Sequence, residues 1–227
     1  MIYMVVTETE EKRESQIARQ VPVKIAIEKM TGDPCLIRWF TDVSLEEIRR
    51  LGVKAIFMMG FGTDIQAIPR SKYRAVERMA LGTEVPLIGI CGGHQLLGCI
   101  FGGDPYFNYP MRKLRRGEPD IAPYHYGMFK EHGFYEVRKV RDDPLFEGLA
   151  SKFIVAQYHY CEVRRMPPDF VLLATNANCR VQAFRHRSRP IYGTQFHFER
   201  YNDDYPDGRR IMANFLKIAG YRKLRLK

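Results

Sequence analysis

Short apolar runs alternate with stretches of helical periodicity from Met1 to Cys91, and this alternation limits the chain to few folds. The pattern predicts strand, helix, strand, helix, strand, helix and strand in that order. Strands that alternate with helices indicate a mostly parallel sheet covered by helices on both faces, and ligands bind such sheets at the carboxyl ends of the strands. The predicted strands are residues 2–6, 34–40, 53–59 and 85–91, and the helices between them are residues 10–30, 44–52 and 71–82.

Start and stop signals support two of these helices. Ser44 and Glu47 form a capping box, in which each side chain can accept a hydrogen bond from the backbone N–H group of the other residue. Gly52 is expected to end that helix, and Ser71 and Gly82 are expected to bracket the next one.

Residues 104–128 interrupt the alternation with prolines, tyrosines and a basic cluster. We interpret this excursion as part of the domain and not as a linker. Beyond it, β-rich segments follow one another with turn signals between them, and a last helix is expected at residues 207–219. The β-rich segments are residues 134–140, 153–163, 170–176, 181–186 and 190–198.

The composition is that of one soluble domain over residues 1–227, with 45% hydrophobic and 27% charged residues. No apolar run approaches the roughly 18 residues of a membrane-spanning helix. The N-terminus lacks the basic start and the cleavage site of a secretion signal, so we expect a cytoplasmic protein without a membrane partner. The net charge of +10 favours an anionic partner, but the basic residues form no recognisable nucleic-acid-binding motif, and no nucleic acid is expected.

The cysteines are five, widely spaced and without a C-x-x-C pair, which indicates neither a disulfide framework nor a zinc site. We predict no metal and no cofactor. Four of the cysteines have no activating neighbour in the sequence and are interpreted as structural: Cys35, Cys99, Cys161 and Cys179.

The strongest chemical signal is Gly89-Ile90-Cys91-Gly92-Gly93, at the junction of a strand and a predicted helix. A side chain exposed at such a sharp turn needs small neighbours two residues before and after it, and glycines provide them. Cys91 would also lie at a helix N-terminus, where the helix dipole favours the nucleophilic thiolate. The motif indicates a nucleophile elbow, although taken alone it also fits a tight turn with an inert buried cysteine.

A second motif, residues 193–199, follows the last predicted strand. Residues two apart on a strand project from the same side, so Glu199 could orient the imidazole of His197 while the other ring nitrogen faces the thiol. Taken alone, this segment also fits a packed histidine. Together the two motifs predict a catalytic triad of Cys91, His197 and Glu199. His94 is a weaker rival as the base, because no carboxylate is placed to orient it.

The two motifs together resemble those of the class I glutamine amidotransferases, G-x-C-x-G-x-Q followed by G-x-Q-F-H-x-E. They stand here at residues 89–95 and 193–199, and the resemblance covers about residues 52–219. It implies a flavodoxin-like three-layer α/β sandwich with a mostly parallel central sheet. It also implies a reaction at the side-chain amide of glutamine, in which Cys91 attacks the amide carbon, His197 transfers protons and Glu199 orients the imidazole. A γ-glutamyl thioester forms, and water then hydrolyses it.

The resemblance further implies an oxyanion hole made by the backbone N–H of Gly92 and by one from the turn Gly60-Phe61-Gly62. The family's usual turn is Gly-Gly-Pro, so either Phe61 or Gly60 could present the second donor here. The family's His-Pro-Glu is His-Phe-Glu in this chain, which loosens the backbone but keeps both functional groups. The residues implied in substrate binding are Gln95, Gly62, His159 and Tyr160, for which a helix-surface or aromatic core position is the alternative.

Three functions stay open at this point. The first is a glutaminase-type subunit that feeds ammonia to a separate synthase partner, since 227 residues leave no room for a synthase domain; residues 104–128 and the basic tail are then candidate docking surfaces. The second is a stand-alone γ-glutamyl hydrolase acting on γ-glutamyl amides or peptides. The third is a non-catalytic binding or regulatory module on the same fold. The triad alone does not separate the first two.

Overall fold

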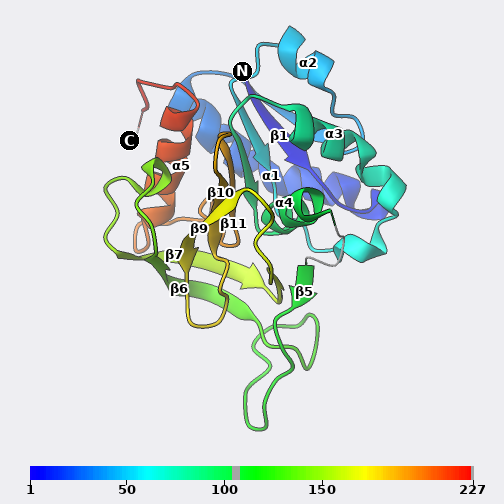
Figure 1. Cartoon of the computed structure of the whole chain (residues 1–227), viewed down its shortest axis with the longest axis vertical. Helices are drawn as coiled ribbons and strands as arrows, with labels where there is room; N and C mark the ends of the chain where they lie inside the picture. Colours follow the sequence, from blue (N-terminus) through cyan, green and yellow to red (C-terminus); the bar gives the residue numbers. More distant parts are fainter. Residues whose placement is uncertain (104–107, 226–227) are drawn as a thin grey trace.

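The computed structural model describes residues 1–103 and 108–225, and within these ranges the chain is built around a nine-stranded sheet (Figure 1). The strand order is β2-β1-β3-β4-β11-β10-β9-β6-β7. A separate pair, β5 and β8, forms a small antiparallel sheet. The strands are β1 Ile2–Val6, β2 Cys35–Trp39, β3 Ala55–Met58, β4 Leu87–Ile90, β5 Asn108–Pro110, β6 Glu131–Lys139, β7 Lys152–His159, β8 Cys161–Val163, β9 Phe170–Thr175, β10 Ala183–His186 and β11 Ile191–Thr194.

The strands β2, β1, β3, β4 and β11 pair in parallel. Every residue of β1, β3, β4 and β11 is buried, as expected where helices cover both faces of a parallel sheet. The four strands predicted before Cys91 are confirmed. The α/β fold class predicted from the sequence is confirmed as well.

The remaining four strands of the large sheet are antiparallel. β10 pairs with β11 and β9, and β6 pairs with β9 and β7. These strands coincide with the β-rich segments predicted after the excursion, but the predicted segment 153–163 is divided between β7 and β8, and the predicted segment 190–198 ends as a strand at Thr194. The parallel arrangement therefore applies to one half of the sheet only.

Helices cover both faces of the parallel half. Phe215 of α5 packs against Phe57 of β3 and Tyr192 of β11, with ring centroids 5.0 and 6.2 Å apart. Gly193, the neighbour of Tyr192, faces His94 of α4 instead. Successive strand residues point to opposite faces, so α4 and α5 lie on opposite sides of the sheet, as the sandwich requires. The helices are α1 Arg13–Thr31, α2 Leu45–Arg50, α3 Arg74–Gly82, α4 Gly92–Gly102 and α5 Asp207–Ile218.

Two of the helix signals act differently from the prediction. Ser44 caps α2 by accepting a hydrogen bond from the backbone N–H of Glu47 at 3.0 Å, but the Glu47 carboxylate bonds to Arg38 and Tyr3 and leaves the capping box half formed. Ser71 does not start α3, because it lies in a 3-10 helix, Arg70–Tyr73, that runs directly into the α-helix.

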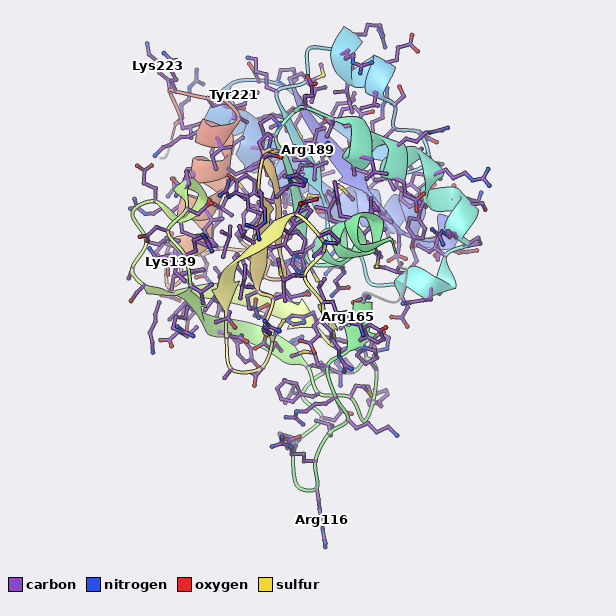
Figure 2. All side chains as sticks on the ribbon, viewed as in Figure 1. Arg116, Lys139, Arg165, Arg189, Tyr221 and Lys223 are labelled. Carbon is purple, nitrogen blue, oxygen red and sulfur yellow. The ribbon has the colours of Figure 1, made fainter. Side chains whose placement is uncertain are left out.

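The excursion forms an arm that projects from the body of the molecule; Figure 2 shows Arg116 at its end, pointing away from the rest of the chain. We define the arm as residues 111–128; residues 104–107 of the predicted excursion lie outside the described ranges. A bridge between Lys113 and Met128 closes the base of the arm, and Arg112 pairs with Glu118 at 2.6 Å. In the part of the chain that is described, no helix is long and apolar enough to cross a membrane.

Candidate active site

Cys91 lies between β4 and α4 with φ 49° and ψ −108°, a backbone conformation that side-chain-bearing residues rarely adopt. The turn is tight enough to exclude larger neighbours. A Cβ atom on Gly93 would lie 2.2 Å from the carbonyl oxygen of Met58, and one on Gly89 would lie 2.6 Å from the carbonyl of Gly93. The glycines therefore have the steric role predicted for them, and the cysteine projects from a sharp strand-to-helix turn.

His197 and Glu199 reach each other without the strand that the sequence suggested. β11 ends at Thr194, and the backbone N–H of His197 donates to the carbonyl oxygen of Ala156 on β7 at 2.8 Å. Beyond this bridge the chain turns, and His197 Nδ1 lies 2.6 Å from Glu199 Oε1. The predicted pairing is present, but a contact to a distant strand positions it instead of strand periodicity.

The imidazole of His197 is buried against two acidic groups. Burial alone would lower its pKa, but the charges of Glu199 and Cys91 and hydrogen bonds to both raise the pKa of His197 to about 9. Burial raises the pKa of Glu199, and the charge and hydrogen bond of His197 outweigh this effect and lower it. These shifts favour an imidazolium between a carboxylate and a thiolate at neutral pH.

Two backbone N–H groups lie beside Cys91. Gly92 is the first residue of α4, so its N–H group has no acceptor within the helix. The N–H group of Phe61 bonds to none of the described residues, and its nitrogen lies 2.9 Å from the position that a Cβ atom on Gly92 would occupy. The carbonyl of Gly60 is turned away, because it accepts a hydrogen bond from Gln16 of α1 at 2.7 Å. Between the two predicted alternatives, this geometry favours Phe61 as the second oxyanion donor.

A buried carboxylate that sequence reasoning missed fixes this turn. Glu8 is 3% exposed and accepts hydrogen bonds from the backbone N–H groups of Gly62 at 3.0 Å and Thr63 at 3.3 Å. Its other oxygen accepts from the N–H of Thr9 at 3.0 Å. An acidic residue two positions after a buried strand was the available signal, but nothing local pointed to a turn more than 50 residues away.

A cavity of about 410 Å³ brings the predicted residues together. Gly92 is the one predicted residue that adjoins this cavity without lining it. The predicted residues that line it are Gly60, Phe61, Gly62, Cys91, Gln95, His159, Tyr160, His197 and Glu199. The unpredicted ones include Arg19 and Gln20 of α1, Tyr124 and His125 of the arm, and Arg200. Part of the wall thus comes from the N-terminal helix and from the arm.

Tyr160 and His159 stabilise the wall of this cavity. The Tyr160 hydroxyl donates a hydrogen bond to Asp64, and its ring stacks on His125 of the arm with centroids 3.6 Å apart. His159 Nε2 lies 2.9 Å from the buried carboxylate of Glu131, and its Nδ1 lies 2.9 Å from the carbonyl oxygen of Cys161. Because both ring nitrogens of His159 already face protein acceptors, any contact it makes with a ligand uses its ring carbons.

His94, the rival base, lies elsewhere. It is fully buried, does not line the cavity, and stacks on Phe184 with centroids 4.3 Å apart. Burial lowers its pKa to about 3, so it is neutral under ordinary conditions. This environment fits a packed core histidine.

The side chains of this cavity suit covalent chemistry at a carbonyl carbon. Among residues 1–103 and 108–225, no group of three or more His, Cys, Asp or Glu side chains could hold a metal ion. The cavity combines a cysteine at an exposed turn, a charged histidine with its carboxylate and two backbone N–H groups. That set suits nucleophilic attack on a carbonyl carbon followed by stabilisation of an oxyanion.

Comparison with known proteins places the chain in a family. The Glutamine amidotransferase class-I pattern matches residues 32–219. The glutaminase-type chain of a GMP synthase [glutamine-hydrolyzing] from Methanocaldococcus jannaschii is 32% identical over 78% of this chain and 81% of its own length. The corresponding chain from Pyrococcus abyssi is 36% identical, over 60% of this chain and 61% of its own length, so the match spans less than two thirds of that relative.

A solved structure agrees over nearly the whole chain. The crystal structure of a candidate GMP synthase subunit from Thermoplasma acidophilum superposes with a TM-score of 0.67 and 26% identity, covering 97% of this chain and 94% of the other. The family pattern, the sequence relatives and the fold all agree. The chain therefore belongs to the class I glutamine amidotransferase family.

Proposed function

We propose that this chain hydrolyses the side-chain amide of glutamine through a thioester on Cys91 and releases the ammonia to a separate synthase partner. One observation carries the proposal. A single cavity contains Cys91 at the strained turn and the His197–Glu199 pair, whose atoms lie 2.6 Å apart. The family of the chain and the names of its relatives support the same conclusion.

In the first half of the reaction, the Cys91 thiolate attacks the amide carbon of glutamine and forms a carbon–sulfur bond. The carbonyl electron pair moves onto oxygen, where the N–H groups of Gly92 and Phe61 stabilise it. Since Glu199 occupies Nδ1 of His197, the proton on Nε2 is available for the leaving nitrogen. The carbon–nitrogen bond then breaks, ammonia leaves and a γ-glutamyl thioester remains.

In the second half, the now neutral His197 accepts a proton from water as the water oxygen attacks the thioester carbon. The same two N–H groups stabilise the second oxyanion. The carbon–sulfur bond breaks, glutamate leaves and the thiolate is restored beside an imidazolium. No step requires a cofactor, and each proton that His197 gives in the first half it regains in the second.

The relatives indicate the kind of partner. Each is named as one of the subunits of a glutamine-hydrolysing GMP synthase, and such a name implies that another chain uses the ammonia. We propose that residues 1–227 act as one amidotransferase domain, in the cytoplasm, and that a GMP-forming synthase chain receives the ammonia. This favours the first of the three functions over a stand-alone γ-glutamyl hydrolase and over a non-catalytic module.

The test is covalent labelling with a diazo-ketone analogue of glutamine, read by intact-protein mass spectrometry, beside ammonia release from glutamine and from γ-glutamyl amides. We expect one label on the wild-type chain, located at Cys91, and a preference for glutamine. Cys91→Ala should abolish both signals while keeping the fold, and Cys99→Ala is the matched control. A folded Cys91→Ala chain with undiminished ammonia release would contradict the proposal, and a preference for substituted amides would indicate the hydrolase.

A further inference from the structure

Gln195 is a fully buried glutamine whose side chain reaches the nucleophile. It lies just after β11, and its Nε2 is 3.7 Å from Cys91 Sγ, within hydrogen-bond distance for sulfur. The sequence motif contains this residue, but neither the proposed mechanism nor the sequence pattern gives it a role. Its side chain is therefore an unassigned polar group in contact with the reacting atom.

The direction of this hydrogen bond follows from a chain of contacts. Gln95 of α4 places one side-chain atom 3.0 Å from the backbone carbonyl oxygen of Cys161. A carbonyl oxygen only accepts, so the facing atom of Gln95 must be its Nε2. The same Nε2 lies 3.1 Å from the Gln195 side chain, which must therefore present its oxygen, Oε1, to Gln95. The amide nitrogen of Gln195 is left facing the sulfur, and it can only donate.

Such a donor distinguishes the two protonation states of Cys91. The neutral thiol has a proton to donate, and the backbone carbonyl oxygen of Tyr158 lies 3.9 Å from the sulfur as an acceptor. The thiolate has no proton and can only accept, so it gains the hydrogen bond from Gln195 and loses the one to Tyr158. Hydrogen bonds to charged groups are stronger than those between neutral groups.

We propose that Gln195 is a catalytic residue that stabilises the Cys91 thiolate by donating a hydrogen bond to it, and that Gln95 is a positioning residue that fixes the direction of this bond. Its importance for turnover rests on the proposed function. The hydrogen bond itself does not, because the thiolate can be detected without glutamine.

Other charged or titratable groups also act on the sulfur and must stay constant in a test. His197 faces it from the segment after β11, with Glu199 behind the ring. Further groups whose charge interacts with that of Cys91 come from other elements: Arg19 of α1, Tyr124 of the arm and Cys161 of β8. A useful substitution therefore changes Gln195 alone and leaves these five side chains in place.

The experiment measures the rate at which iodoacetamide alkylates Cys91 as a function of pH, in the full chain, with peptide mass spectrometry to separate Cys91 from the other cysteines. The variants are Gln195→Leu, which removes the donor, and Gln195→Glu, which keeps the size and the acceptor for Gln95 but presents oxygen to the sulfur. Gln157→Leu is the matched control, because Gln157 is equally buried but donates to Gln182 and not to the sulfur.

We expect the midpoint of the alkylation profile to move to higher pH by about one unit in Gln195→Leu and by more in Gln195→Glu, with roughly tenfold slower alkylation below the midpoint. The Gln157→Leu profile should coincide with that of the wild-type chain. A Gln195 variant that keeps the wild-type midpoint would overturn the inference.

Folding is checked by the melting temperature of each variant. The leucine and glutamate side chains place opposite demands on a buried site, so the profile of whichever variant melts like the wild-type chain decides the question. Failure of the proposed function is a different result: the midpoint would shift in the Gln195 variants while the wild-type chain, tested with a range of synthase extracts, released no ammonia from glutamine.

Discussion

The two sides of the cavity are built in different ways. On the nucleophile side, residues 89–93 form a turn that local sequence determines, because glycines are needed wherever the backbone comes within 2.2 to 2.6 Å of a hypothetical Cβ atom. On the base side, residues 195–199 depend on distant elements. Ala156 of β7 fixes the backbone of His197, and Gln95 of α4 orients Gln195. The comparison teaches that one half of a site can be local and the other half entirely tertiary.

The largest effect is expected from Gly93→Ala on the local side. The added methyl group would overlap the backbone of Met58, which cannot move without displacing β3, so we expect a loss of about 3 kcal/mol in the free energy of unfolding and loss of covalent labelling. Gly52→Ala is the control: its φ is also positive at 58°, but no atom lies within 4 Å of the new methyl group, and the loss should be about 1 kcal/mol. Urea denaturation measures both, and equal losses would remove the distinction.

Glu199→Gln tests the tertiary side. The variant keeps the size of the side chain but removes the charge that favours the imidazolium of His197, and we expect ammonia release to fall about 100-fold. The residual rate should stay above that of Cys91→Ala, because nucleophile and base are still present. If the two variants were equally inactive, Glu199 would do more than orient and stabilise the imidazole.

Glu8→Gln tests whether the oxyanion turn is positioned from a distance. An amide can present one acceptor oxygen where the carboxylate presents two, so part of the support of Gly62 and Thr63 is lost. We expect about a tenfold fall in kcat with little change in KM, because the oxyanion donors act mainly in the transition state. Glu10→Gln, on the exposed start of the preceding 3-10 helix, is the control. A change in KM alone would place Glu8 in substrate binding instead.

The smallest effect separates the two histidines near Cys91. The pKa of buried His94 is lowered to about 3 from an unfolded value of about 6.5, so the unfolded chain binds more protons than the folded chain between these values. The folded chain should therefore lose stability as pH falls below about 6.5, by about 1 kcal/mol per pH unit from this group. His94→Leu should reduce that slope in urea denaturation at pH values of about 5.5 and 7.5. An unchanged slope would show that His94 is not buried as a neutral group.

Much of the fold could be predicted because its signals are local. Buried apolar runs such as Ile2–Val6 and Leu87–Ile90 are strands, and Ser44 caps the helix that follows it. The antiparallel strands were also recognisable one by one. Their order was not, since β6 lies between β9 and β7 through pairings that no turn or periodicity specifies.

The site divides along the same line. Cys91, His197 and Glu199 stand in compact motifs, and their residue types already suggest the chemistry. Glu8 was missed because its partners lie 54 and 55 residues away, and Gln195 was left without a role because its orientation follows from Gln95 and a carbonyl oxygen on a third element. The arm residues that line the cavity were included in the excursion, but no sequence rule aims them at Cys91.

The most direct test of this account is acid-quenched mass spectrometry of the chain during incubation with glutamine. The account predicts a γ-glutamyl adduct on the Cys91 peptide that accumulates before glutamate is released and disappears when glutamine is exhausted. Ammonia formation with no adduct on Cys91, or with an adduct at another residue, would contradict it.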